Sequence, residues 1–309
     1  MRPTSSRVVG PTSLPLVSGP LRIAALNING IRAAHRRGFG DWLATRGCDV
    51  VTLQEVRCPV DALPEDAFGD YEVAYDAGEI PGRNGVAVLT REPAAAVRTW
   101  AVPDPERPLP RKLRRHATEG RYIEVDLADV PLTVASLYLP KGGLPEHLQD
   151  PKRMREAPDG GAKHLRKMAF MAGFARHVTA ARRHAAAAGR EFLLTGDLNI
   201  AHQRLDVAAY KRSNQTEGFL PEERAWLDAL ITPRTLVDVV RELHPDVAGP
   251  YSWWSWLGRA YDEDRGWRID YHLATPRLAR TARSAVVDRH HLGMRLSDHA
   301  PVVVDYDFS

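Results

Sequence analysis

Cysteine is scarce in this chain: Cys48 and Cys58 are the two found among 309 residues. A disulfide framework therefore has little support, and the two residues indicate reduced thiols in a cytosolic protein. Neither a cysteine cluster nor an HExxH motif is present to suggest a zinc site. No run of about 18 apolar residues occurs either, so the sequence predicts no transmembrane helix.

Acidic residues are missing from the start of the chain, where Asp41 is the first. Residues 1–20 contain Pro, Ser, Thr and Gly without clear periodicity, which predicts a disordered N-terminal tail. Pro11, Pro15 and Pro20 interrupt any apolar core of a secretory signal, although an acid-free start with Arg and Ser also resembles a transit peptide. The sequence leaves open whether this segment is a functional tail, a targeting segment or a mis-assigned start.

The remaining composition is that of a globular protein, with 44% hydrophobic and 26% charged residues. No repeat and no linker interrupts residues 21–309, so we expect one domain there. A net charge of +3 and a pI of about 8.9 are weak signals of a polyanionic partner. Basic residues do form clusters, but each cluster alone is better explained by a solvated surface.

Alternating apolar and polar residues predict many strands, most with one buried face. The expected strands cover 21–27, 49–54, 71–75, 85–91, 122–127, 131–139, 191–196, 236–240, 268–274, 284–288 and 301–306. Helices are expected at 36–46, 162–188 and 221–231. Many strands with few helices predict an α+β layered sandwich, with two packed sheets and helices outside.

A hydrophobic strand at 191–196 runs into Gly196 and then presents a carboxylate and a carboxamide. Asp197 and Asn199 are two residues apart, so in extended geometry both side chains leave the same face. Alone, Gly-Asp-x-Asn is equally consistent with a plain strand-ending turn. Other predicted strands carry acids, amides or a phenol at or near their ends, and these residues are Asn27, Asn29, Gln54, Glu55, Tyr138, Asp270 and the segment 297–299. Their recurrence favours a functional site over unrelated turns.

The recurring groups limit the chemistry of such a site. Hard oxygen ligands suit Mg²⁺ or Mn²⁺ rather than zinc, and they are offered by Glu55, Asp197, Asn199 and Asp298. His299 beside a strand carboxylate such as Asp270 is a pairing in which an acid orients an imidazole. Acidic ligands, a divalent ion and an oriented histidine together suit hydrolysis of a phosphoester.

Nine short motifs in a fixed order extend this set along the chain from Leu21 to about Phe308. They are LNINGIR at 26–32, LQEVR at 53–57, EGRY at 119–122, LYLP at 137–140, GDLNIAH at 196–202, GFLPEER at 218–224, YSWW at 251–254, GWRID at 266–270 and SDH at 297–299. In these motifs the chain resembles the exonuclease III type of apurinic/apyrimidinic endonucleases, within the endonuclease/exonuclease/phosphatase superfamily. The resemblance implies a DNase-I-like α/β fold, a four-layer αββα sandwich of two mixed sheets flanked by helices, with the site at one edge of the sheets.

The resemblance also implies a role for each matching residue. The implied metal ligands are Asn27, Glu55, Asp197, Asn199, Asp298 and His299, and the implied catalytic groups are Tyr138, Asp197, Asn199, Asp270 and His299. Tyr138 would contact the scissile phosphate, and Asn199 would support the transition state. Asp197 would align or deprotonate the attacking water, with His299, oriented by Asp270, as the rival base. Whether one or two metal ions act stays open.

Substrate contacts are implied at Asn29, Arg32, Lys141, Lys211, Trp253, Trp267 and Ile269. The segment from Trp253 to Asp270 resembles the family loop whose aromatic residues enclose a flipped-out abasic sugar. For Trp254 and Trp256 an ordinary aromatic core is the preferred interpretation. Lys141 and Trp253 depart from the residues common in relatives, so the balance between abasic-site incision and 3′→5′ exonuclease action stays open.

The leading hypothesis is a Mg²⁺-dependent DNA repair nuclease that acts as a monomer on double-stranded DNA in the cytoplasm, associated with the nucleoid. It would incise 5′ of abasic sites and trim 3′ ends. One alternative is a phosphomonoesterase or a phospholipid or phosphoinositide phosphoesterase of the same superfamily. Another is a catalytically silent DNA-binding module, although a pure binder of a polyanion has no need to gather carboxylates.

Overall fold

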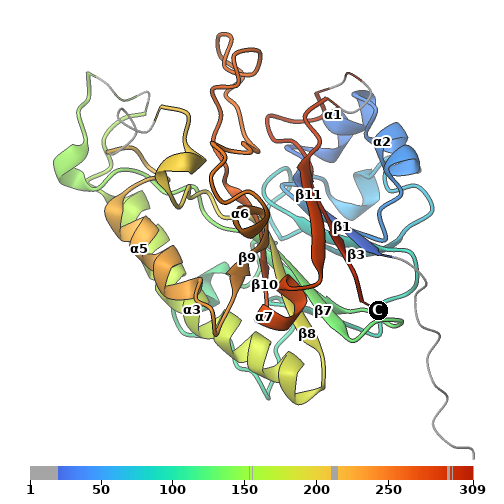
Figure 1. Cartoon of the computed structure of the whole chain (residues 1–309). Helices are drawn as coiled ribbons and strands as arrows, with labels where there is room; N and C mark the ends of the chain where they lie inside the picture. The colour runs from blue at the N-terminus through green and yellow to red at the C-terminus, as the bar shows by residue number, and fades with distance from the viewer. Residues whose placement is uncertain are drawn as a thin grey trace, which may run out of the picture.

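Two six-stranded β-sheets lie face to face in the computed structural model of this chain (Figure 1). The structure describes residues 20–152, 154, 156–209, 215–290, 293 and 295–308. The first sheet has the strand order β11-β12-β1-β2-β4-β3, and the second has the order β5-β6-β7-β8-β10-β9. The tail expected at 1–20 falls almost wholly outside the described residues.

The strands of the first sheet are β1 (Leu21–Asn27), β2 (Val50–Gln54), β3 (Glu72–Asp76), β4 (Val86–Thr90), β11 (Ala282–Val287) and β12 (Val302–Tyr306). Those of the second sheet are β5 (Ala96–Thr99), β6 (Tyr122–Asp126), β7 (Leu132–Tyr138), β8 (Glu191–Asp197), β9 (Val237–Asp238) and β10 (Asp270–Ala274). The α-helices are α1 (Ile31–Arg36), α2 (Phe39–Arg46), α3 (Ala162–Ala187), α5 (Pro221–Leu230), α6 (Val239–Leu243) and α7 (Pro276–Ala279). Short 3-10 turns are η1 (Val60–Ala62), η2 (Arg114–His116), η3 (Glu146–Leu148) and η4 (Arg204–Asp206).

Three apolar layers hold the sheets and helices together. Along β1, Ile23 belongs to the layer between the two sheets, whereas Leu26 belongs to the layer beneath α1 and α2. Along β8, Leu193 lies between the sheets and Leu194 packs beneath α3, where Phe170 meets it. Strands buried on both faces carry apolar residues in succession, as Phe192, Leu193 and Leu194 do in β8. The four-layer sandwich of two mixed sheets is therefore confirmed, because each sheet combines parallel and antiparallel pairs.

Expected and observed elements agree to within about two residues at most strand boundaries, and three departures have local causes. The helix expected at 36–46 begins at Phe39, because the chain turns at Gly38 with φ 90°, and Arg36 instead ends the preceding helix α1. The strand expected at 236–240 ends at Asp238, whose side chain accepts a hydrogen bond from Arg241 N and caps α6. The edge strand β5 was not predicted, because its four residues, Ala-Val-Arg-Thr, are too few to show a clear alternation of apolar and polar residues.

Polar side chains join the two sheets near the end where β2 and β8 finish. Thr52 Oγ1 lies 2.7 Å from Thr195 Oγ1, and Gln54 Nε2 donates to Ser136 Oγ at 2.9 Å. All four residues are buried, so each bond satisfies a polar group that water cannot reach. These bonds fix how the two sheet edges meet. In the described part of the chain, no helix combines the length and the apolar character needed to cross a bilayer.

Two buried histidines make the stability of this fold depend on pH. His272 hydrogen-bonds Val302 O and the Tyr306 hydroxyl, and burial lowers the pKa of His272 to about 4. Burial likewise lowers the pKa of His177 to about 4. Between about pH 6.5 and 4 these two histidines therefore bind more protons in the unfolded chain than in the folded one, and their contribution to stability falls as the pH falls through that window.

We expect the free energy of unfolding, from urea titrations, to drop by about 3 kcal/mol for each of these histidines between pH 7 and pH 4. His272→Gln removes one of the two groups, so its pH slope should be shallower although it is less stable at pH 7. A slope in His272→Gln as steep as in the wild type would contradict this assignment.

Candidate active site

Strand register delivers polar residues to one edge of the two sheets. β7 and β8 are parallel, with Tyr138 opposite Asp197, and the antiparallel β10 places Asp270 on the other side of Asp197. Asn27 ends β1 in the first sheet, and its Nδ2 donates to Asp197 Oδ2 in the second sheet at 2.9 Å. The same Asn27 amide donates to Glu55 Oε1 at 2.8 Å, so one side chain links the acids of both sheets.

Gly196 is required just before the central acid. It has φ 129°, and a Cβ at this position would lie 2.1 Å from Leu137 O on the neighbouring strand. The close approach lets Asp197 follow directly at the strand end, where Asn199 N donates to its Oδ1 at 2.8 Å. Asn199 Nδ2 bonds Leu139 O at 2.9 Å and Asp197 Oδ2 at 3.2 Å.

His299 lies between two buried carboxylates. Its Nδ1 is 2.8 Å from Asp270 Oδ2, and its Nε2 is 3.8 Å from Asp197 Oδ2. Ser252 fixes the position of Asp270, because its hydroxyl donates to Asp270 Oδ2 at 2.6 Å. Arg268, two residues before Asp270, does not pair with it, since the Arg268 guanidinium bonds Asp206 and Asp238.

Burial and charge shift the proton affinities of this set. Burial, reinforced by the charge of Asp270, raises the pKa of Asp197 to about 7, although the charge of His299 opposes the rise. Burial acts to lower the pKa of His299, but the charges of Asp270, Asp197 and Asp298 outweigh it and raise that pKa to about 10. The imidazole is therefore a cation at neutral pH, and Asp197 is the group poised to exchange a proton there.

A second group of acids lies beside the first. Glu55 pairs with the Arg57 guanidinium, which also donates to Asn29 Oδ1 at 2.5 Å. Asn29 Nδ2 in turn donates to Asp298 Oδ1 at 2.7 Å. The Asn27 amide nitrogen faces the acids, and its Oδ1 accepts a hydrogen bond from Asn29 N.

Hard oxygen donors at this edge fit a divalent cation. Among the described residues, Asp197, Asp270 and His299 form one group whose ligand atoms all lie within 4.8 Å of one another. Glu55 and Asp298 supply further carboxylates next to it. Arg57 neutralises Glu55, whereas the hydrogen-bond donors to Asp298 among the described residues are neutral groups such as the Asn29 amide and the Trp253 indole, so a cation beside Asp298 would supply the missing positive charge.

Four site residues have the left-handed backbone conformation that side chains other than glycine rarely adopt: Asn29 (φ 46°), Glu55 (φ 52°), Arg57 (φ 53°) and Asn199 (φ 50°). Such conformations cost of order 1–3 kcal/mol each and persist where the surroundings hold them. They follow directly after β1, β2 and β8, where each strand turns away from its sheet. Their concentration at one edge marks it as a functional region.

Tyr138 completes the inner part of the site at the end of β7. Burial, followed by the charges of Glu55 and Asp197, raises the pKa of Tyr138 well above its ordinary value. The phenol thus stays protonated and can donate a hydrogen bond to an anion. Arg121 lies over its ring, with the guanidinium carbon 5.1 Å from the ring centre.

An aromatic wall stands beside the acids. Trp253 and Trp267 meet edge to face with ring centres 6.4 Å apart, and Phe219 meets Trp267 in the same way at 6.2 Å. Ile269 packs in the same apolar cluster. Trp253 Nε1 also donates to Asp298 Oδ2 at 3.1 Å, which ties the wall to the acids. The predicted Trp253, Trp267 and Ile269 are thus brought together.

Two of the predicted substrate-binding residues, Arg32 and Lys141, are not part of this buried cluster. Arg32 is exposed on α1, and Lys141 pairs with Glu217 at 3.1 Å from an exposed position. Lys211 lies outside the described residues. The structure therefore brings together the other predicted residues that it describes and leaves the side chains of Arg32 and Lys141 exposed.

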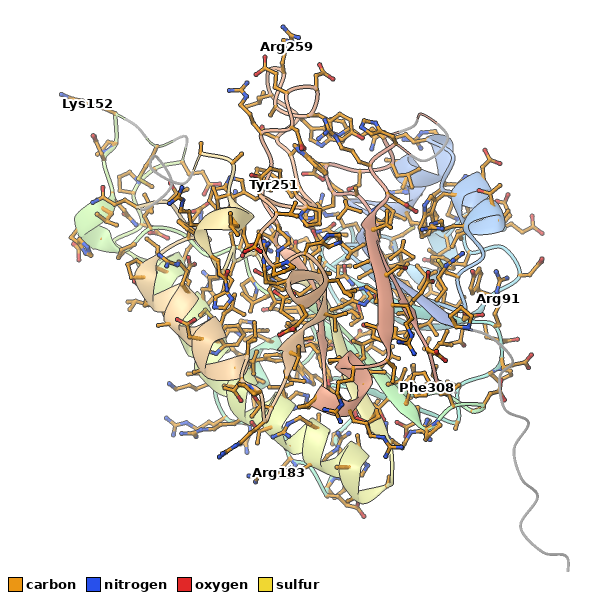
Figure 2. All side chains as sticks on the ribbon, in the orientation of Figure 1. Arg91, Lys152, Arg183, Tyr251, Arg259 and Phe308 are labelled. Atoms are coloured by element: carbon orange, nitrogen blue, oxygen red, sulfur yellow. The ribbon has the colours of Figure 1, made fainter. Side chains whose placement is uncertain are left out.

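The interpretation of Trp256 as core was wrong. Trp254 is buried as expected, but Trp256 is 47% exposed on the projecting segment between Tyr251 at its base and Arg259 near its tip (Figure 2). The Arg295 guanidinium lies 3.9 Å from the Trp256 ring centre. Stacking on arginine lets a large aromatic residue stay at the surface.

Sequence reasoning missed several residues that complete the site. Ser252 and Phe219 stand inside motifs that had been recognised, YSWW and GFLPEER, and the polar or aromatic character of each could have identified them. Arg57 ends the LQEVR motif, but nothing in the sequence tells that its side chain turns back to Glu55. The cysteines behave as expected, since Cys48 and Cys58 are free and buried.

Known proteins match this chain along nearly its whole length. The DNA repair nuclease APEX1 of Danio rerio is 28% identical over 288 residues, which cover 92% of this chain and 81% of that protein. The exodeoxyribonuclease of Bacillus subtilis is 28% identical over 289 residues, which cover 91% of this chain and 98% of that protein. The solved structure of an AP endonuclease from Archaeoglobus fulgidus superposes with a TM-score of 0.73 at 25% identity, covering 93% of this chain and 99% of that one.

These similarities confirm the resemblance to the exonuclease III type of enzyme and the expected class, a hydrolase of this nuclease group. A sequence model of the Endonuclease/Exonuclease/phosphatase family matches residues 24–299. The matched range contains the central carboxylate, the histidine and the aromatic wall described above. The chain therefore belongs to the Endonuclease/Exonuclease/phosphatase family.

Proposed function

We propose that this protein is a Mg²⁺-dependent DNA repair nuclease that incises duplex DNA 5′ of abasic sites and trims 3′ ends. The observation that carries the proposal is the buried triad in which His299 contacts both Asp270 and Asp197. Tyr138 and Asn199 lie beside Asp197. A carboxylate with raised pKa next to a fixed imidazolium suits attack of water on a phosphodiester.

Each side chain has one task in this proposal. Asp197 takes the proton from water as the water oxygen bonds to phosphorus. The bond between phosphorus and the 3′ oxygen of the preceding nucleotide breaks, and that oxygen leaves as a 3′-hydroxyl once protonated. His299, held cationic by Asp270, together with the Tyr138 phenol and the Asn199 amide, stabilises the charge on the phosphate oxygens. Glu55 and Asp298 would hold Mg²⁺, or Mn²⁺ in its place, and the bound ion supplies positive charge to the phosphate.

The aromatic wall supports the choice of an abasic nucleotide over other phosphoesters. Trp253, Trp267, Phe219 and Ile269 offer flat apolar surface next to Asp298 rather than the polar groups that an inositol ring would need. A deoxyribose without its base has an apolar face and leaves the helix at the lowest cost, because no base pair or stacking is lost. Relatives carrying names such as DNA repair nuclease and exodeoxyribonuclease support the same choice. We further propose that the enzyme acts as a monomer on nucleoid DNA in the cytoplasm.

A gel assay with three labelled duplexes tests the proposal. One contains a tetrahydrofuran abasic analogue, one is intact and one has a recessed 3′ end. We expect the purified protein with Mg²⁺ to cut the first duplex 5′ of the analogue and to shorten the third, and EDTA to abolish both. Inert abasic DNA would refute the proposal, and turnover of soluble phosphoinositides or sphingomyelin instead would favour the phosphoesterase alternative.

A further inference from the structure

Lys167 on α3 is a charged residue with a fully buried side chain. Its Nζ lies 2.7 Å from Glu223 Oε1 of α5, and the Glu223 side chain is fully buried too. The stem of Lys167 fills the space beside Gly142, where a Cβ would lie 2.5 Å from the Lys167 Cδ. Burial acts to lower the pKa of Lys167, and the charge of Glu223 opposes that shift.

The other contacts of this ammonium lead to the site. Nζ donates to Asn199 O at 2.9 Å and to Lys141 O at 3.0 Å. Two hydrogen bonds of the ammonium thus go to loop carbonyls, and its charge is balanced by the ion pair with Glu223. Lys141 follows β7 and Asn199 follows β8, so one atom joins the two loops that leave the strands of Tyr138 and Asp197.

We propose that Lys167 is a positioning residue of the nuclease site, which holds Asn199 and the loop after β7 in one fixed arrangement. This inference rests on the proposed function, which makes the fixed position of Asn199 important for catalysis. Asn199 needs support of this kind because its backbone has φ 50° and its side chain must reach both Asp197 and Leu139 O.

The energetics favour a role in positioning over a role in stability. A buried ion pair loses so much hydration that apolar residues of the same size are often as stable or more stable. Glu223 alone could cap α5, since its Oε2 accepts a hydrogen bond from Leu220 N at 3.0 Å. Apolar residues could not donate the two hydrogen bonds that Lys167 makes to the loop carbonyls of Lys141 and Asn199.

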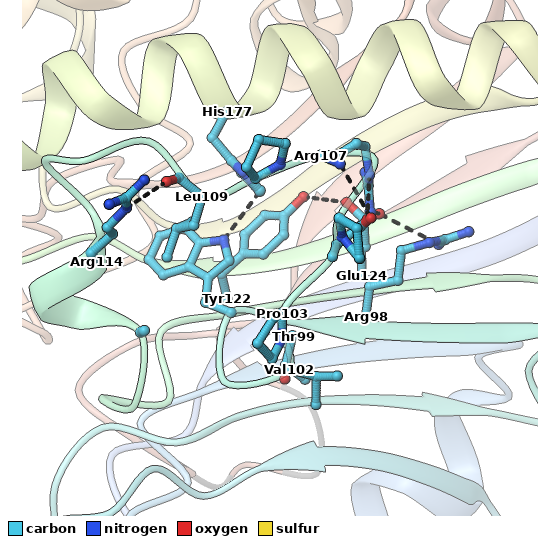
Figure 3. A pocket seen from close by; sticks show the side chains of 15 residues that line it. Arg98, Thr99, Val102, Pro103, Arg107, Leu109, Arg114, Tyr122, Glu124 and His177 are labelled. Carbon is cyan, nitrogen blue, oxygen red and sulfur yellow. Dashed lines mark hydrogen bonds and ion pairs between the residues drawn. The ribbon is translucent and has the colours of Figure 1, made fainter.

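A matched buried pair lies away from the site. Glu124 on β6 pairs with Arg107 at 2.7 Å and accepts a hydrogen bond from Tyr122 at 2.7 Å. It lines a cavity of about 390 Å³ on the α3 side of the second sheet, where Trp100 hydrogen-bonds His177 (Figure 3). Removal of this pair takes away one positive and one negative charge, as removal of Lys167 and Glu223 does, and its further partners Asp104 and Arg98 lie away from both loops of the site.

The test compares two double variants with the wild type. Lys167→Met/Glu223→Gln should fold, because no unpaired charge remains and the capping oxygen is kept, yet its kcat on abasic duplex should fall roughly 10- to 100-fold with KM changed less than about threefold. The control Arg107→Met/Glu124→Gln should keep kcat within about threefold. Glu223→Gln alone keeps an acceptor for Lys167 and should also retain kcat within about threefold.

Hydrogen exchange gives a readout that needs no substrate. Peptides covering residues 139–143 and 197–201 should exchange at least about tenfold faster in Lys167→Met/Glu223→Gln and at the wild-type rate in the control. Wild-type kcat with wild-type exchange in the site variant would overturn the inference, as would equal losses in both double variants. If the wild type cuts no DNA, the proposed function fails, while the exchange comparison still decides whether Lys167 couples the two loops.

Discussion

Asp197→Asn should lower kcat/KM for abasic duplex by roughly 10³- to 10⁴-fold while the protein stays folded, with a thermal midpoint within about 5 °C of the wild type. An asparagine has nearly the shape of the acid but cannot take a proton from water. It also removes the negative charge that, with Asp270, holds His299 cationic. The loss should therefore appear in kcat, with a much smaller change in KM.

Asp126→Asn is the matched control for this prediction. Asp126 is also a buried strand aspartate, but it bonds Thr133 at 2.6 Å and pairs with Arg98 at the opposite end of β6 and β7 from Tyr138. Its substitution should cost about 1–3 kcal/mol of stability and leave kcat/KM within about threefold. Full activity of Asp197→Asn would refute the role assigned to Asp197, and an unfolded variant would show that the acid is structural.

Arg268→Met should lower the free energy of unfolding by about 3–5 kcal/mol, which urea titration measures. Arg268 is almost fully buried, and its guanidinium donates to Asp206 at 2.7 Å and to both oxygens of Asp238 at 3.0 and 2.7 Å. Methionine fills similar space but leaves Asp238 charged without this partner. Because Arg268 lies between Trp267 and Ile269 in the chain, we also expect a higher KM for abasic DNA.

A compensating change checks the cause of that loss. Arg268→Met/Asp238→Asn removes the stranded charge and keeps an oxygen for Arg241 N at the start of α6, so it should recover about half of the lost stability. A cost below about 1 kcal/mol for Arg268→Met alone would contradict the prediction. No recovery in the double variant would mean that packing against Tyr271, rather than charge, sets the cost.

The strand ends could be predicted from the sequence because two-residue periodicity and the change from apolar to polar residues are local signals. Asp197, Asp270 and Tyr138 stand at such ends, and sheet pairing then brings them together without further information. The resemblance of the motifs supplied the roles that no periodicity could. It also drew attention to Trp253 and Trp267, which do form one wall.

Contacts between distant side chains could not be predicted, because they leave no pattern along the chain. Lys167 and Glu223 lie on different helices, and nothing local in the sequence marks either residue as buried. Trp256 was assigned to the core from the general tendency of tryptophan to be buried, a tendency that stacking on Arg295 overrides. The start of α2 after Gly38 depends on the left-handed backbone there, which glycine permits but does not enforce.

Hydrolysis in water enriched in ¹⁸O, followed by mass spectrometry of both fragments, tests the central claim most directly. If Asp197 activates water for attack on phosphorus, the upstream fragment must end in an unlabelled 3′-hydroxyl. The downstream fragment must carry one ¹⁸O atom on its 5′-phosphate after a single cut. An upstream fragment that ends in an unsaturated sugar, or label in its 3′-hydroxyl, would contradict hydrolysis at this site.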